Sequence, residues 1–470
     1  MIKKNKFIIL IIFLGFIISV FLSVNNLVKY DKNITQDNGG SYHQMIKYDA
    51  YRYLSHGNEI KNQLKNGLNF FETGREHYTK YLPARIYAAY YYFFDIDLFE
   101  DSDETKIKVG NHLPYLVMQS LLYYLAIAFL YTVISKTINQ KTSLFIIIFL
   151  CFEPTILQYH SSFWSESIFF SLQILLISLI LKRDHSNLSL FFTGIFLTIL
   201  SFQKEYSIFY IIPVMIYLRL TMNSFKYKKF IYLIIGFFLF QSVLGLNNYK
   251  RSGQFYIMTA DSKINLHMDL VSKVMNKKFK NDTNEFHEIE SKAVLQWIYK
   301  NSITLNKELI DHENKRFTKY RVALSEIDKV KFDNFIRNRT FDYFYEYPMD
   351  FIKYIIKSSI HIVLLNPFHI YSDHNFFSGE FYNLTETHDK LVPYRIVYTL
   401  IIYTICLYGL YFMIKKKEYN ILIYLFFSII YFYGLVSWHG NTRYFMPVVI
   451  YLSFFFGYGL IGITDFKKKN

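Results

Sequence analysis

Residues 42–60 read YHQMIKYDAYRYLSHGNEI, and residues 81–94 read YLPARIYAAYYYFF. These two stretches, which follow the first apolar segment, decide how the rest of the chain is interpreted. When residues 46–64 are written as a helix, apolar and ionisable side chains separate onto neighbouring faces. The apolar face contains Ile46, Ala50, Tyr53, Leu54, Gly57, Ile60 and Leu64, and the polar stripe contains Asp49, Arg52, His56, Glu59 and Gln63. This pattern predicts a helix that lies on a membrane surface with its apolar side toward the lipid.

The composition places the chain among polytopic membrane proteins. Of its 470 residues 52% are hydrophobic, and these gather in runs long enough to span a bilayer, while the charged residues gather between the runs. The formal charge of +15 lies mostly beside the ends of apolar runs, where it sets orientation and meets anionic lipid, so it does not indicate nucleic-acid binding. Cys151 and Cys406 both fall in apolar segments, which argues against a disulfide and against a cysteine-based metal site.

The apolar runs and the lysine clusters predict about ten transmembrane helices with both termini in the cytoplasm. Lysines precede the first run, which is interpreted as an uncleaved span because no clear cleavage site follows it. The predicted spans are residues 7–23, 113–135, a short span ending near 153–154, 167–182, 188–202, 206–220, 230–246, 393–414, 419–437 and 444–463.

These spans divide the chain into three parts. Residues 1–246 form an N-terminal transmembrane module whose first outer loop, 24–112, carries the candidate catalytic helix. Residues 247–349 are rich in charge and lack a long apolar run, so they are expected to form a soluble, helical, extracytoplasmic insert. Residues 350–470 comprise a second surface helix and the last three spans.

The segment 350–365 decides the topology. Its apolar run of ~15 residues is shorter than the ~20 needed to cross a bilayer. Asp350, Lys353, Lys357 and His361 form a polar stripe at helical spacing, which favours a helix lying on the outer surface. Counting this segment as a span would also place the lysine clusters 415–417 and 467–469 outside, against the positive-inside rule.

Ionisable residues collect at the predicted outer ends of the spans, whereas the inner ends carry mostly lysine and arginine. This asymmetry favours an active site that faces outward. The main candidates for such a site are Asp49, Glu166, Lys204 and Arg443. A second tier of candidates contains Arg52, His56, Glu59, Glu153 and Trp164. Each also has a structural explanation, such as a first-turn acid for Glu166 or a lipid-headgroup contact for Lys204 and Arg443.

Several motifs occur in the order found in a known family. They are Asp49 followed by an aromatic helix and YLP at 81–83, SESIFF at 165–170, LSFQK at 200–204 and GNTRYFMP at 440–447, with NNY at 247–249 and YEYP at 345–348 bordering the insert. Together they resemble bacterial membrane glycosyltransferases of the GT-C superfamily, which includes protein O-mannosyltransferases and lipid A aminoarabinose transferases. The resemblance covers nearly the whole chain. One departure is that many relatives carry an Asp-Glu pair, whereas Asp49 is followed by Ala50.

The resemblance implies a GT-C-like bundle and an inverting glycosyltransferase that takes its sugar from a polyprenyl-phosphate donor. Asp49 would be the base for an acceptor hydroxyl, Lys204 and Arg443 would hold the leaving phosphate, and Glu166 would orient acceptor or sugar hydroxyls. The acceptor would be a lipid, a glycan or a protein, and neither a cofactor nor a metal is implied. The protein would reside in the plasma membrane, with its active site on the extracytoplasmic side and membrane lipids as partners.

Three other classes remain open from the sequence. A lipid-linked sugar flippase or other transporter would place ionisable groups near the bilayer midplane, whereas the centres of these spans are almost free of charge. A polysaccharide polymerase would use a long basic outer loop such as 247–349. A scaffolding membrane protein would have no requirement for Asp49.

Overall fold

The computed structural model describes residues 2–34, 49–68, 81–100, 103–182, 185–221, 228–253, 255, 257, 264, 266–278, 283–310, 312, 316–364, 384–436 and 445–467. Regular structure in these residues is almost entirely helical, and the prediction of an all-α polytopic membrane protein is confirmed. The exception is a small antiparallel hairpin of β1 (Phe99–Glu100) and β2 (Asp103–Ile107).

The helices form one bundle and two polar appendages. The bundle contains α1 (Ile2–Ile34), α4 (Leu113–Thr137), α5 (Gln140–Phe152), α6 (Pro154–His160), α7 (Glu166–Leu181), α8 (Asn187–Gln203), η2 (Glu205–Tyr210), α9 (Ile211–Thr221), α10 (Lys228–Ser252), α17 (Leu384–Lys415), α18 (Tyr419–Val436) and α19 (Met446–Lys467). The first appendage contains α2 (Asp49–Lys65), α3 (Tyr81–Phe93), the hairpin and η1 (Val109–His112). The second contains the π-helix η3 (Leu266–Val271), α12 (Ser272–Lys278), α13 (Thr283–Lys300), η4 (Lys307–Leu309), α14 (Lys319–Val322), α15 (Glu326–Glu346) and α16 (Pro348–Leu364).

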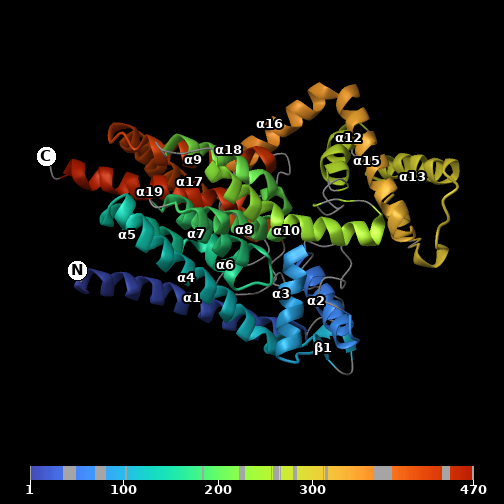
Figure 1. Ribbon diagram of the computed structural model, residues 1–470, viewed down its shortest axis with the longest axis horizontal. Coiled ribbons are helices and arrows are strands. Elements are labelled where there is room, and N and C mark those ends of the chain that lie inside the picture. Colours follow the sequence, from blue (N-terminus) through green and yellow to red (C-terminus); the bar gives the residue numbers. More distant parts are fainter. Residues whose placement is uncertain are drawn as a thin grey trace.

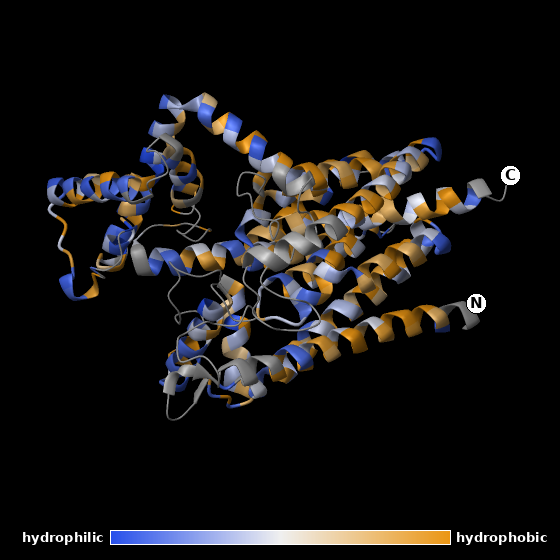
Figure 2. Cartoon of the chain, turned by 180° about the vertical axis from the view of Figure 1, so that it is seen from behind, coloured by the Kyte–Doolittle hydropathy of each residue, from blue (hydrophilic) through white to orange (hydrophobic). Residues whose placement is uncertain are grey.

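Both chain termini lie at one end of the bundle, and α2, α3, α12, α13 and α15 lie at the opposite end (Figure 1). Apolar residues dominate the bundle helices, whereas the appendage beyond α10 is largely polar (Figure 2). The two polar appendages therefore share one end of the bundle, as the ten-span topology requires. The assignment of that end to the extracytoplasmic side stays a prediction.

Each of the ten predicted spans contains a helix, but the helices differ in length. Among the described residues, five are long and apolar enough to cross a membrane: Lys6–Val28, Gly110–Thr137, Lys229–Lys250, Ile396–Lys415 and Met446–Asp465. A sixth span results if α5 and α6, which are bent by 52°, count as one. The apolar segments in α7, α8 and α18 are shorter; the 16 residues of α7 cover about 24 Å, less than the ~30 Å of a hydrocarbon core.

The short helix α7 lies at the centre of the bundle. Nearly all of its side chains are buried, and Phe169, Phe170, Ile174 and Ile177 belong to the main hydrophobic core. Because protein surrounds α7, it need not match the lipid thickness on its own. The charged residue that opens it, Glu166, is consequently held inside the protein.

Helix α2 confirms the predicted amphipathic pattern but corrects what covers the apolar face. Ala50, Leu54 and Ile60 are fully buried, as the spacing predicts. This face packs on α3 and not on lipid: Ile60 clusters with Ala84 and Ala88, and a Cβ added to Gly57 would lie 2.6 Å from the Cβ of Tyr87. Periodicity predicts an apolar face, but a helix from the same loop covers it.

Glycine pairs let two pairs of bundle helices cross at close range. A Cβ on Gly409 of α17 would lie 1.8 Å from a backbone oxygen of α19, and one on Gly459 would lie 2.1 Å from a backbone oxygen of α17. Gly194 and Gly236 make the same kind of contact between α8 and α10. In a membrane the hydrophobic effect does not drive helices together, so their association depends on close van der Waals packing. Small residues at such crossings allow the two backbones to make this close contact.

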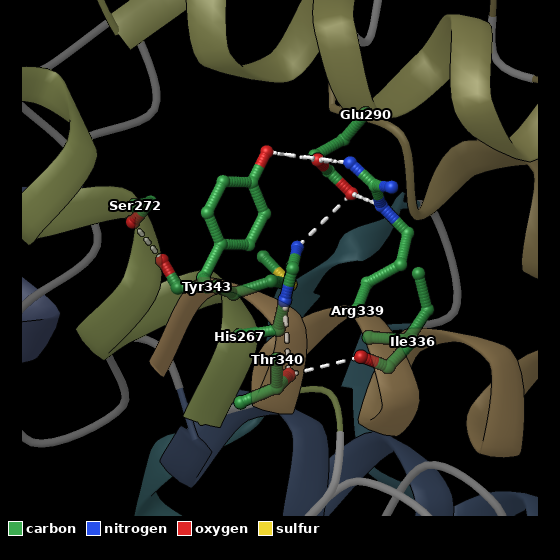
Figure 3. A network of polar contacts seen from close by, with 8 residues as sticks. His267, Ser272, Glu290, Ile336, Arg339, Thr340 and Tyr343 are labelled. Atoms are coloured by element: carbon green, nitrogen blue, oxygen red, sulfur yellow. Dashed lines mark hydrogen bonds and ion pairs between the residues drawn. The ribbon is translucent and has the colours of Figure 1, made fainter. Parts of the chain in front are cut away.

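The insert has its own hydrophobic core and a buried polar network (Figure 3). Arg339 of α15 donates to both oxygens of Glu290 of α13 at 2.5 and 2.7 Å, and the Tyr343 hydroxyl donates to the same carboxylate at 2.8 Å. His267 of η3 lies 3.1 Å from Glu290 through Nε2 and 2.9 Å from the Thr340 hydroxyl through Nδ1. Burial raises the pKa of Glu290, but hydrogen bonds and charge from Arg339 and His267 outweigh it and lower the pKa to about 2. The network therefore joins three elements through one ionised carboxylate.

The insert core extends past the predicted boundary at residue 349. Its last member is Phe351 of α16, and Tyr354 and Ile355 pack against it. Helix α16 is thus part of the insert core along one face and leads into the last group of spans.

Candidate functional site

The connection between α6 and α7, residues 161–165, is buried between the bundle helices and α3. Irregular backbone at membrane depth needs internal hydrogen-bond partners, because lipid supplies none. Side chains from four helices donate hydrogen bonds to this connection or its border. Gln119 of α4 donates to the carbonyls of His160 and Ser162 (2.7 and 2.9 Å), and Tyr87 of α3 donates to the carbonyl of Phe163 (2.8 Å). Gln203 of α8 donates to the carbonyl of Ser165 (2.8 Å), and Asn26 of α1 donates to the Ser161 hydroxyl (2.9 Å). The position of this connection is therefore set by helices from distant parts of the sequence.

A buried ion pair lies where this connection enters α7. The ammonium of Lys204, the residue after α8, lies 2.5 Å from Oε1 of Glu166, and the two side chains are 1% and 4% exposed. The Ser165 hydroxyl contacts the other carboxylate oxygen at 3.4 Å. Taking both charges out of water is costly, so such a pair is weak evidence for stability, and charged groups inside a membrane protein point to function. Two of the four main predicted site residues thus meet in the fold.

A second polar contact lies beside this pair. Nδ1 of His160, the last residue of α6, is 2.5 Å from the hydroxyl of Ser167, which follows Glu166 on α7. Both side chains are fully buried, and the imidazole ring lies 4.1 Å from that of Tyr123, centroid to centroid. Two consecutive residues of α7 are therefore held by polar groups from other helices.

Glu153 and Trp164 occupy structural positions. Glu153 lies at the bend between α5 and α6, and its carboxylate caps α6 by accepting from the Ile156 N–H and the Thr155 hydroxyl, both at 2.8 Å. This is the ordinary role of an acid at a helix N-cap. Trp164 is buried in the main hydrophobic core. These positions add no support for Glu153 and Trp164 as candidate site residues.

The remaining predicted residues lie on or near α2, or outside the described residues. Asp49 opens α2, but its side chain lies outside what the structure describes; Arg443 lies wholly outside it. Arg52 is exposed, while His56 and Glu59 are half-buried. Helix α2 is nevertheless linked to the ion pair, since it packs on α3 and α3 contacts residues 161–165 through Tyr87. A meeting of Asp49 and Arg443 with the ion pair stays a prediction.

Polar residues to which the sequence assigns no role in the site hold this region together. Gln119 and Gln203 lie within apolar helices, where an uncharged polar side chain is itself a signal for an internal contact. Lys61 of α2 is buried and donates to Asp97 at 2.7 Å; this hydrogen bond and the lysine charge lower the pKa of Asp97. No group of three or more metal-ligating side chains gathers within the described ranges.

These features define a polytopic helical integral membrane protein with a buried polar site at the end of the bundle that carries both appendages. No family model and no curated protein matches the chain. Among solved structures, the chain is similar to the archaeal oligosaccharyltransferase AglB from Archaeoglobus fulgidus in complex with an inhibitory peptide and a dolichol-phosphate, with a TM-score of 0.48 and 13% identity. The match covers 98% of this chain and 51% of that protein, so the chain spans about half its length. A likeness at this level says nothing about the activity of this chain.

Proposed function

We propose that this protein is a membrane glycosyltransferase that moves a sugar from a polyprenyl-phosphate donor to an acceptor hydroxyl on the extracytoplasmic side. The observation that supports the proposal is the buried pair of Glu166 and Lys204, which joins an acid and a cation at the end of the bundle next to α3. A polyprenyl donor requires a lipid-facing protein with fixed cations at one membrane surface. The apolar helices of the bundle support the first requirement, and Lys204, held by Glu166, is the described candidate for the second.

In the proposed reaction Asp49 takes the proton of the acceptor hydroxyl. The hydroxyl oxygen forms a bond to the anomeric carbon, the bond from that carbon to the phosphate oxygen breaks, and the electron pair leaves with the phosphate. A positioned carboxylate contributes about 10²–10⁴-fold to such a proton transfer. Attack from the face opposite the phosphate inverts the anomeric centre.

Lys204 and Arg443 stabilise the charge that grows on the leaving phosphate. Glu166 is the counter-ion of Lys204 before the donor arrives, so the two act as one unit. The donor phosphate would replace part of the carboxylate contact with Lys204, which frees a Glu166 oxygen to accept from an acceptor or sugar hydroxyl.

The first experiment identifies the product. Cell-envelope glycans from cells with and without this protein are compared by mass analysis, and the sugar that differs defines the donor. The purified protein is then placed in liposomes with that polyprenyl-phosphate sugar, and formation of the new glycosidic bond is followed. Asp49→Asn is expected to lower the rate by at least ~10²-fold, whereas the control Asp342→Asn, an exposed acid on α15, is expected to leave it unchanged.

Two outcomes would overturn the proposal. One is transfer by Asp49→Asn at the wild-type rate, which would remove the base. The other is movement of the labelled lipid-linked sugar across the bilayer with no new glycosidic bond, which would establish a flippase.

A further inference from the structure

Helix α16 exposes an apolar stripe that no described part of the chain covers. Met349, Ile352, Ile356 and Ile360 are 60%, 49%, 54% and 51% exposed. Their spacing of three and four residues places them on one face of the helix. Such a row of half-exposed large aliphatic side chains needs an apolar partner to leave water.

The opposite face of α16 is fixed by protein. Phe351 and Ser358 are buried, and Tyr354 and Ile355 pack on the core of the insert. The helix therefore cannot rotate to hide its stripe without breaking the insert core. The direction in which the stripe faces is set by the fold.

The position of α16 brings the stripe to the end of the bundle. The Tyr433 hydroxyl of α18 donates to the carbonyl of Ser359 at 2.9 Å, so the C-terminal part of α16 lies against an apolar bundle helix. Figure 1 shows α16 running from the insert toward this end. The stripe thus runs from the insert to the end of the bundle at which α18 meets α16.

Positive charge borders the stripe. Lys353 and Lys357 follow Ile352 and Ile356 directly and are exposed. An apolar face flanked by lysines is the pattern of helices that lie in the headgroup region of a bilayer. Two copies of this chain joined through the stripe would bring the lysines of both copies together, so charge complementarity favours an anionic partner.

The sequence already predicts that α16 lies on the membrane surface. We propose that its aliphatic stripe lies among the lipid chains and that Lys353 and Lys357 bind anionic headgroups. Since its other face belongs to the insert core, this contact fixes the insert at one height above the membrane. The proposal is independent of the proposed glycosyltransferase activity, and its test requires no substrate.

The test measures the depth of a nitroxide label in nanodiscs. Both native cysteines are replaced by serine, and the label is placed at Ile356→Cys or, as a control, at Leu309→Cys, an apolar residue of the insert with nearly the same exposure (52% against 54%). In bilayers of phosphatidylcholine with phosphatidylglycerol, the label at 356 should collide with oxygen and be shielded from a water-soluble nickel complex, because interfacial helices bury their apolar face about 5–10 Å deep. The label at 309 should show the reverse.

The charge contribution is tested with Lys353→Gln and Lys357→Gln. In anionic bilayers, each variant is expected to lower the ratio of lipid-shielded to water-accessible label at position 356 about five-fold, equivalent to ~1 kcal/mol per lysine. In pure phosphatidylcholine these variants should match the wild type. Equal shielding of wild type in both bilayers would overturn the headgroup assignment.

Two further results would overturn the whole proposal. One is access of the nickel complex to position 356 equal to that at 309. The other is shielding accompanied by dipolar broadening between labels, which would show that a second copy of the chain covers the stripe.

Discussion

Replacing Lys204 with methionine removes the ammonium that lies 2.5 Å from Glu166 and leaves a carboxylate in a site with almost no water access. Removing one partner of a buried ion pair costs about 3–5 kcal/mol, because the other charge stays desolvated. Replacing both partners, as Glu166→Gln with Lys204→Met, removes the uncompensated charge and is often neutral. The double variant is therefore expected to be more stable than Lys204→Met alone, with a coupling energy of at least ~2 kcal/mol.

The assay is unfolding in detergent micelles for the wild type, both single variants and the double variant, so that the cycle yields the coupling energy. Lys65→Met serves as the control, because Lys65 also pairs with an acid, Asp95, but both side chains are exposed. Water screens that pair, so the control is expected to change stability little.

The same four proteins separate structure from chemistry. A double variant that regains stability but not sugar transfer would assign the pair a role in the reaction. Single effects that simply add would refute the reasoning, since they would show that Glu166 and Lys204 do not depend on each other. Full transfer by the stable double variant would restrict the pair to a structural role.

Two other predictions concern the insert and the bundle. Glu290 has a folded pKa of about 2 against an ordinary value of 4.5, so it adds stability above pH 4.5 that is lost as the pH falls toward 2. Glu290→Gln should flatten this pH dependence of stability, measured by the fluorescence of Trp297 with the other two tryptophans replaced by phenylalanine. An unchanged pH profile would contradict the stabilising role of the pair of Glu290 and Arg339. Gly409→Leu should separate α17 from α19 and lower the thermal unfolding midpoint in detergent by several degrees. The control Gly434→Leu should leave the midpoint unchanged, because an added Cβ there meets nothing within 4 Å. Equal midpoints for the two variants would show that the close crossing does not contribute to stability.

The sequence predicts the local elements well because their signals are local. The spacing of Ala50, Leu54 and Ile60 predicts the buried face of α2, and the short apolar run at 350–365 predicts a helix separate from the spans. The same spacing does not identify the partner of a face, and α3, not lipid, covers α2. Amphipathicity describes how apolar and polar side chains separate onto opposite faces of a helix. It carries no information on whether lipid or another helix covers the apolar face.

The site is less accessible to sequence reasoning because its contacts are long-range. Glu166 and Lys204 could each be selected as an ionisable residue at a span end, but their 38-residue separation sets no distance between them. The hydrogen bond from Gln119 to the carbonyl of His160 is equally invisible in the sequence. Helix packing determines such contacts, and a single sequence constrains packing only through composition and length.

The hydrogen bonds at residues 161–165 also impose an order on biosynthesis. A chain grows from its N-terminus, so α1, α3 and α4 can hold this connection as soon as it enters the membrane, but the carbonyl of Ser165 and the charge of Glu166 must wait for Gln203 and Lys204. Until α8 has left the ribosome, the nascent protein carries an acid and a bare carbonyl that lipid cannot solvate. The end of the bundle that holds Glu166 and Lys204 is therefore completed only when α8 arrives, and translation arrested before residue 203 leaves an intermediate that the translocon or a membrane chaperone must shelter.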